Sequence, residues 1–118
     1  MNRDISDMIY AAAKEVIDIY PVVADVEEFE KLPLPYAVYR IEQRYARTKE
    51  QRRSEWEVGF LVVANGYSEC WALTAKLETA IEGVSGKEVV AKAIGGNVQF
   101  DGDDRVYIGE TTVEIKEL

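Results

Sequence analysis

Few residues of this 118-residue chain have side chains suited to covalent or proton-transfer chemistry. Histidine is absent, and Cys70 is the single cysteine. A catalytic thiol needs a base that holds it as the thiolate, so a cysteine–histidine pair is impossible here. We therefore expect Cys70 to be a buried structural residue, as free cysteines commonly are, and we expect the chain not to be an enzyme.

Two clusters of carboxylates are the remaining candidates for acid–base work or for binding Mg²⁺ or Ca²⁺. The cluster in residues 25–30 is interrupted by apolar side chains, and the D-G-D-D segment at 101–104 lacks the spacing of a calcium loop. The segment G-G-N at 95–97 matches no phosphate-binding pattern and is expected to form a turn. These segments predict solvated surfaces and turns, with no cofactor and no metal.

The most distinctive polar segment is a basic run, R-T-K-E-Q-R-R-S, at 47–54. It lies between two apolar segments typical of strands, so it projects into solvent as a charged loop. We expect its arginines to pair with acidic groups of a neighbouring copy, because arginine binds carboxylates in a bidentate way at interfaces. A merely solvated loop is one alternative. Contact with single-stranded nucleic acid is another, because Tyr39 and Tyr45 lie among the arginines.

The candidate interface residues are Arg44, Tyr45, Arg47, Lys49, Arg52, Arg53 and Trp56, of which Tyr45 and Trp56 would supply apolar contact area.

Composition limits the remaining classes of function. The chain has 14 basic and 22 acidic residues and a net charge of −8, which opposes general binding to nucleic acid or to anionic membranes. No apolar run approaches the roughly 20 residues of a membrane span, and the N-terminal segment is not a signal-peptide core.

The length suits one domain, residues 1–118. A single cysteine allows no disulfide within the chain, so we expect a reducing, cytoplasmic compartment.

Apolar residues at three- and four-residue steps predict two helices. The first helix is expected over 5–19 and is ended by Pro21. The second is expected over 68–82, with Ser68 as its N-cap and Gly83 at its C-terminal end. The expected apolar stripe of the second helix is Ala72, Leu73, Leu77, Ala80, Ile81 and Val84, with Ala75 or Lys76 at its edge.

Strand-type segments at 36–41 and 56–64 flank the basic run and predict a hairpin with a long tip. A short strand is also possible at 22–26. Apolar runs at 97–100 and 106–108 flank an Asp-Gly pair and predict a second hairpin.

The last strand is expected to reach residue 116, and Gly109 within it marks either a bulge or a close approach of another group. The order of these elements predicts the α+β class: two helices packed on one face of a mainly antiparallel, twisted β-sheet, with a long-tipped hairpin arm.

Several segments, in this order, resemble the tail-terminator (tail-completion, minor tail) proteins of long-tailed bacteriophages. They are an N-terminal helix, P-Y-A-V-Y-R-I at 35–41, a polar arm, and W-E-V-G-F-L-V-V-A at 56–64. The chain then leads through N-G-Y-S-E into the helix W-A-L-T-A-K-L-E-T-A-I and ends with R-V-Y-I-G-E-T-T-V-E-I.

The resemblance implies a small α+β subunit that assembles into a ring, commonly a hexamer, which caps the tail tube and joins it to the head and neck. The implied partners are other copies of the chain, the tail-tube protein and the head–neck connector proteins, without sequence-specific nucleic acid and without a membrane. The implied location is the virion tail, and the host cytoplasm during assembly. The resemblance places the arm that reaches toward the neighbouring subunit at residues 44–54.

Three alternatives stay open at this point. A neck or head–tail joining protein is the first, because such proteins are also small α+β subunits that form rings. A small enzyme or non-catalytic ligand-binding domain would need a deep polar pocket. A nucleic-acid-binding domain would use the basic hairpin tip and bind in a salt-dependent way.

Overall fold

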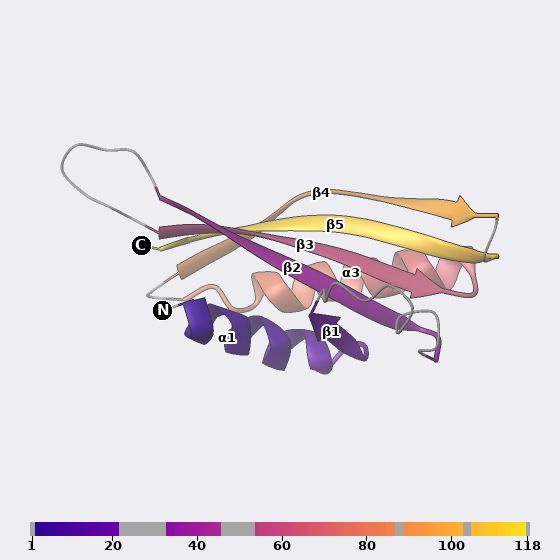
Figure 1. The fold of residues 1–118 in the computed structure, drawn as a ribbon, viewed down its shortest axis with the longest axis horizontal. Coiled ribbons are helices and arrows are strands. Elements are labelled where there is room, and N and C mark those ends of the chain that lie inside the picture. Colours follow the sequence, from indigo (N-terminus) through magenta and orange to yellow (C-terminus); the bar gives the residue numbers. More distant parts are fainter. Residues whose placement is uncertain (1, 22–32, 46–53, 87–88, 103–104, 118) are drawn as a thin grey trace.

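The computed structural model describes residues 2–21, 33–45, 54–86, 89–102 and 105–117. Within these ranges the elements are α1 (Asn2–Lys14), β1 (Ile19–Pro21), β2 (Tyr36–Tyr45), β3 (Ser54–Ala64), α3 (Tyr67–Glu82), β4 (Val89–Asp101) and β5 (Val106–Glu117) (Figure 1).

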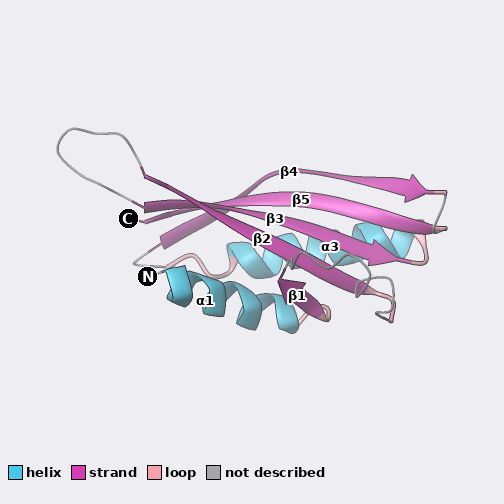
Figure 2. Ribbon diagram, in the orientation of Figure 1, coloured by secondary structure: helices cyan, strands magenta, loops and turns pink. Residues whose placement is uncertain are grey.

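The strands of the described residues form one sheet in the order β1-β2-β3-β5-β4. Strand β1 is parallel to β2, and every other neighbouring pair is antiparallel. Both helices lie on the same side of the sheet (Figure 2). The predicted α+β class, with two helices on one face of a mainly antiparallel sheet, is confirmed.

Helix α1 packs on the sheet through Ile5, Ile9 and Ala13, which recur every four residues and are all buried. The prediction of a helix to residue 19 is wrong at its C-terminal end, because α1 ends at Lys14. The amides of the next residues bond back to the Ala13 carbonyl in a turn, and the chain then enters β1.

Tertiary pairing explains the early end of α1. Residues 16–20 are rich in β-branched and aromatic side chains, which favour an extended backbone next to a sheet. Ile19 pairs in parallel with Ala37, and both side chains are buried in the core. The strand predicted at 22–26 lies outside the described residues.

The β2–β3 hairpin is confirmed and is longer than the predicted segments, because its register runs from Tyr36↔Val63 to Tyr45↔Ser54. Alternate residues of β3 point to the helices, and Trp56, Phe60 and Val62 form part of the core.

Helix α3 confirms the helix predicted over 68–82, but its ends and its buried stripe differ from the prediction. The N-cap is Gly66 without a side-chain bond, so Ser68 is not the cap. Gly83 ends the helix in the right-handed region, with φ of −66°. The stripe differs because Thr74 is buried and Ala72 is exposed. The buried residues of α3 are Cys70, Thr74, Leu77 and Ile81.

Gly109 in β5 explains how a polar residue can lie in the buried stripe of α3. A Cβ atom at Gly109 would collide with Thr74 Oγ1 and would lie 3.2 Å from Cys70 Sγ. The missing side chain therefore leaves room for Thr74, whose hydroxyl donates a hydrogen bond of 2.8 Å to the Cys70 carbonyl. Of the two readings of Gly109, the close approach is correct, and the register shift lies in β4 between Ala93 and Gly95.

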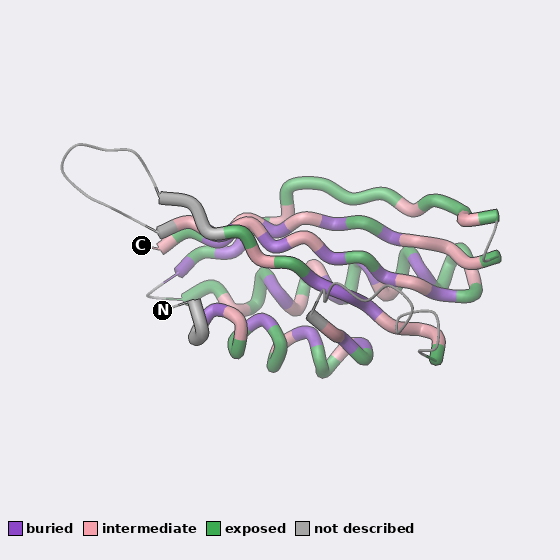
Figure 3. Tube along the Cα trace, in the orientation of Figure 1, coloured by how far each residue is buried: buried purple, intermediate pink, exposed green. Residues whose placement is uncertain are grey.

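Strands β4 and β5 form the predicted second hairpin, and both are longer than expected. The prediction of a turn at 95–97 is wrong, because these residues lie inside β4. Strand β4 is an edge of the sheet, and its residues from 94 to 100 are mostly exposed (Figure 3).

Candidate functional site

The stem of the β2–β3 hairpin carries the predicted interface residues that the structure places. Arg44 and Tyr45 are the last residues of β2, paired with Glu55 and Ser54 of β3. The other basic members of the predicted interface, Arg47, Lys49, Arg52 and Arg53, lie outside the described residues.

Trp56, predicted to supply apolar contact area, lies in the core with 3% of its surface exposed. It points to the helix side of the sheet together with Val58 and Phe60. A contact of Trp56 with another subunit stays a prediction, and replacing it would also remove core packing within the chain.

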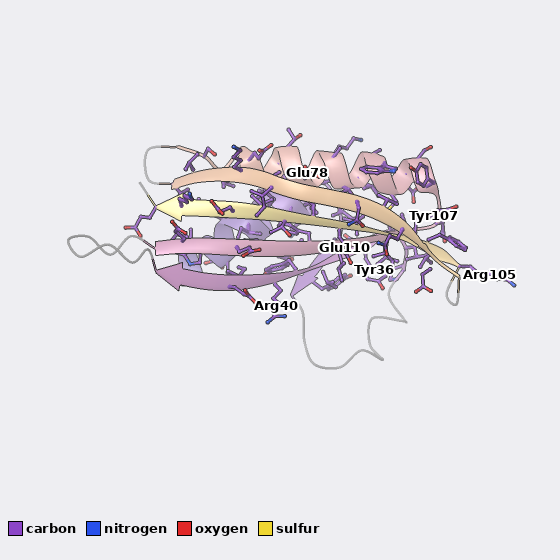
Figure 4. All side chains as sticks on the ribbon, turned by 90° about the horizontal axis from the view of Figure 1, so that it is seen from above. Tyr36, Arg40, Glu78, Arg105, Tyr107 and Glu110 are labelled. Carbon is purple, nitrogen blue, oxygen red and sulfur yellow. The ribbon has the colours of Figure 1, made fainter. Side chains whose placement is uncertain are left out.

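The sheet surface opposite the helices, here called the open face, carries both carboxylates and basic side chains. Strand register places Glu42, Glu57 and Glu114 side by side across β2, β3 and β5. Arg40 pairs with Glu42, and Lys116 pairs with Glu114, each at 3.1 Å. Lys116 donates a hydrogen bond to the Glu114 carboxylate, and this bond together with the negative charge of Glu114 raises the pKa of Lys116. Figure 4 looks onto this face, with Arg40 at its β2 side. Exposed pairs of this kind contribute little to stability.

A shallow hollow on the open face is the nearest approach to a ligand pocket there. Its polar lining includes Arg40 and Glu110, and its apolar lining includes Val38 and Leu61. Both charged side chains are exposed to solvent (Figure 4), so the hollow lacks the enclosure that small-molecule sites usually have.

Cys70 is buried on α3, as predicted. Its thiol lies 3.6 Å from the carbonyl oxygens of Val62 and Tyr107, as a weak donor to both. Burial raises the pKa of the Cys70 thiol, so the thiol stays protonated near neutral pH. A protonated, enclosed thiol is a poor nucleophile.

The residues that the structure describes show neither a metal-binding cluster nor a membrane-spanning helix. No group of three or more cysteine, aspartate or glutamate side chains there is arranged to hold a metal ion. Neither α1 nor α3 has the length and apolar character that crossing a bilayer requires.

A surface that sequence reasoning missed lies at the end of the molecule opposite the hairpin stem. We call it the aromatic end surface and define it as Tyr67, Trp71, Phe100 and Tyr107. Their rings contact one another in an unbroken row. The ring centroid of Tyr67 lies 6.3 Å from that of Trp71 and 5.7 Å from that of Tyr107, and the ring centroid of Phe100 lies 5.0 Å from that of Tyr107. One sequence signal was present: Tyr67 and Trp71 are four residues apart on a helix.

The hairpin stem and the aromatic end surface lie at opposite ends of the longest dimension of the molecule, which is 50 Å. In Figure 1 the stem of β2 and β3 is at the left, and the end of β4 and the start of β5 are at the right. Figure 4 shows the same separation from above, with Tyr107 and Arg105 labelled at the right end.

Comparisons with known proteins show similarity in fold. No family model matches the chain, and no curated protein matches it. Among solved structures, the fold is similar to that of a chain in "Virion of native gene transfer agent (GTA) particle". The TM-score is 0.65 at 12% sequence identity, over 96% of this chain and 90% of that chain. At this identity, the likeness shows that the two chains share a fold over nearly their whole lengths.

Proposed function

We propose that this chain is a structural subunit of a phage-like virion, and not an enzyme. The observation that carries the proposal is the fold shared, over almost the full length of both chains, with a component of a gene transfer agent virion. The match covers 96% of this chain and 90% of that chain, so the shared fold accounts for most of both chains.

Within this role, we propose a tail terminator: a homo-oligomeric ring, with six copies as the first expectation, that caps the tail tube and joins it to the head–neck connector. The long hairpin supports a self-contact, because residues 46–53 contain four basic residues and one acidic residue in a chain of net charge −8. A basic tip on an acidic body can attract another copy of the same chain. The proposed location is the virion tail, and the host cytoplasm during assembly.

Ring formation tests the proposal directly. We expect a ring-sized species when the purified chain is concentrated, measured by light scattering and by negative-stain electron microscopy. Reversing the arm with Arg47→Glu, Arg52→Glu and Arg53→Glu should lower self-association at least about tenfold, which corresponds to roughly 1.4 kcal/mol. A chain that remains monomeric at millimolar concentration would rule out the homo-oligomeric ring.

A control with the same net charge separates the arm from general repulsion. The three arm replacements each lower the net charge by 2, from −8 to −14. Lys14→Glu, Lys76→Glu and Lys92→Glu produce the same −14 with exposed side chains on α1, α3 and β4. Equal loss of assembly in the two triple variants would remove the arm from the proposal.

A terminator and a neck protein differ in their neighbours, so co-purification distinguishes them. We expect a tagged copy, expressed with the other virion proteins, to retain the tail-tube protein. Retention of portal and adaptor proteins without the tail tube would favour the neck or head–tail joining role.

A further inference from the structure

The aromatic end surface is unusually exposed for large apolar side chains. Tyr67 is 53% exposed, Trp71 40% and Phe100 58%. Single exposed aromatic residues are common, but a continuous patch of them on a small domain is typical of an interaction site. These three rings come from two elements that are far apart in sequence, α3 and β4.

Packing holds this surface in one arrangement before any partner binds. Tyr107 is partly buried against the core and contacts both Tyr67 and Phe100 edge-on or tilted. Phe100 is also fixed opposite Tyr107 by the β4–β5 register. A partner would therefore find ordered rings, so that little conformational entropy is lost on binding.

The surface has the chemistry that binds a cation of planar shape. Aromatic faces attract guanidinium groups through their quadrupole, and arginine also stacks on them. Acidic residues lie close by in the sequence: Glu69 is in the first turn of α3, and residues 101–105, at the end of β4 and before β5, contain three aspartates and one arginine. An arginine-rich, cationic segment is the partner that these groups match.

The chain itself contains such a segment at its other end. This arginine-rich tip is residues 46–53, which follow β2 and precede β3 in the sequence and contain three arginines and one lysine. A contact between two different surfaces at opposite ends of a molecule joins copies head to tail, and such a contact generates a ring when the rotation closes. A symmetric two-fold contact would instead stop at a dimer.

We propose that the aromatic end surface is the docking site for the arginine-rich tip, residues 46–53, of the next copy of this chain. This proposal rests on the ring assembly proposed above, and it adds the receiving surface for the arm. The proposed contact has a direction, since each copy contributes its tip to one neighbour and its aromatic end surface to the other.

Two one-sided variants test the direction of the contact. The arm variant carries Arg47→Glu, Arg52→Glu and Arg53→Glu, and the end variant carries Tyr67→Ser, Trp71→Ser and Phe100→Ser. Each variant alone should self-associate at least about tenfold more weakly than the unaltered chain. Mixed together they should form a one-to-one dimer and no ring, because only one intact contact remains between them. Native mass spectrometry measures both results.

Controls separate docking from folding. Tyr10→Ser removes an aromatic ring that is 41% exposed on α1, and it should leave assembly unchanged. Circular dichroism should show a folded end variant; if that triple variant unfolds, Phe100→Ser alone, at the most exposed ring, is used in the same mixture.

Each outcome has a distinct meaning. Normal rings from a folded end variant would overturn this inference and leave the proposed ring intact, with the docking surface elsewhere. A mixture of the two variants without a dimer would overturn the pairing of this surface with the tip. An unaltered chain that never assembles would overturn the proposed ring itself.

Discussion

Gly109 is the position of β5 at which a side chain would collide with α3. Its hydrogen occupies the space next to Thr74 Oγ1 and Cys70 Sγ, two atoms of the buried face of that helix. Interiors are packed as densely as organic crystals, so a single added methyl group must displace its neighbours. The helix can lie this close to the sheet because position 109 is a glycine.

We expect Gly109→Ala to lower the free energy of unfolding by about 1–3 kcal/mol through overpacking. Gly59→Ala is the matched control, since its added methyl group would meet no atom within 4 Å, and its effect should stay within about 0.5 kcal/mol. Urea denaturation followed by circular dichroism measures both. Adding Thr74→Ala should reduce the cost of Gly109→Ala, and a strictly additive double variant would show that Thr74 is not the obstacle.

Arg105 is a residue of the β4–β5 hairpin that has a positive φ, although the hairpin was predicted from the Asp-Gly pair before it. The Asp-Gly pair at 101–102 predicted a hairpin, because glycine tolerates positive φ in tight turns. The hairpin is present, yet among the described residues the positive φ, 55°, belongs to Arg105 and not to a glycine. The hairpin was therefore predicted correctly, and its left-handed residue is one that the sequence pattern did not single out.

Glu82, the last residue of α3, and Ser85, which follows it, bond to backbone groups on the edge of β4. The Ser85 hydroxyl accepts a hydrogen bond from the Ala91 amide at 2.9 Å and donates one to the Ala91 carbonyl at 3.3 Å. A Glu82 oxygen accepts a bond from the Ala93 amide at 3.0 Å. An exposed sheet edge can pair with other chains, so these side chains protect the edge up to the register shift that follows Ala93.

We expect Ser85→Ala to destabilise the chain by about 1 kcal/mol and to speed hydrogen exchange at the Ala91 amide. Ser68→Ala is the control, because Ser68 is an exposed helix residue that does not cap α3, and its effect should be within about 0.5 kcal/mol. Hydrogen exchange read by NMR, amide by amide, measures the difference. Unchanged exchange at Ala91 would show that the hydroxyl does not protect this edge.

The residues that the structure describes share one hydrophobic core, to which α1, α3 and the sheet contribute. The core cluster of the described residues runs from Ile5 and Ile9 of α1 through Trp56 and Phe60 of β3 to Leu77 of α3. Since no element has a separate core of its own, the chain should unfold as one cooperative unit.

Two probes in different environments test this cooperativity. The chain has two tryptophans, so Trp71→Phe leaves the buried Trp56 as the single indole fluorophore. At low micromolar concentration, urea curves from Trp56 fluorescence and from far-UV circular dichroism should superimpose. Separated midpoints would contradict the prediction of a single domain, residues 1–118.

The amino-acid sequence by itself determined the type and order of most elements. Periodicity is a local property, so two helices, two hairpins and the α+β class followed from the spacing of apolar residues. The same local information predicted the burial of Cys70 and, at Gly109, either a bulge or a close approach, of which the close approach is correct. It also identified a basic hairpin tip, whose role in assembly stays a prediction.

Tertiary structure alone decided where elements end and which surfaces meet. Helix α1 stops early because Ile19 gains a parallel partner in Ala37, and β4 runs through residues 95–97 because β5 pairs with them. The aromatic end surface joins residues 67 and 71 to residues 100 and 107. Such contacts depend on how distant segments pack in three dimensions, and no local pattern of residue types specifies that packing.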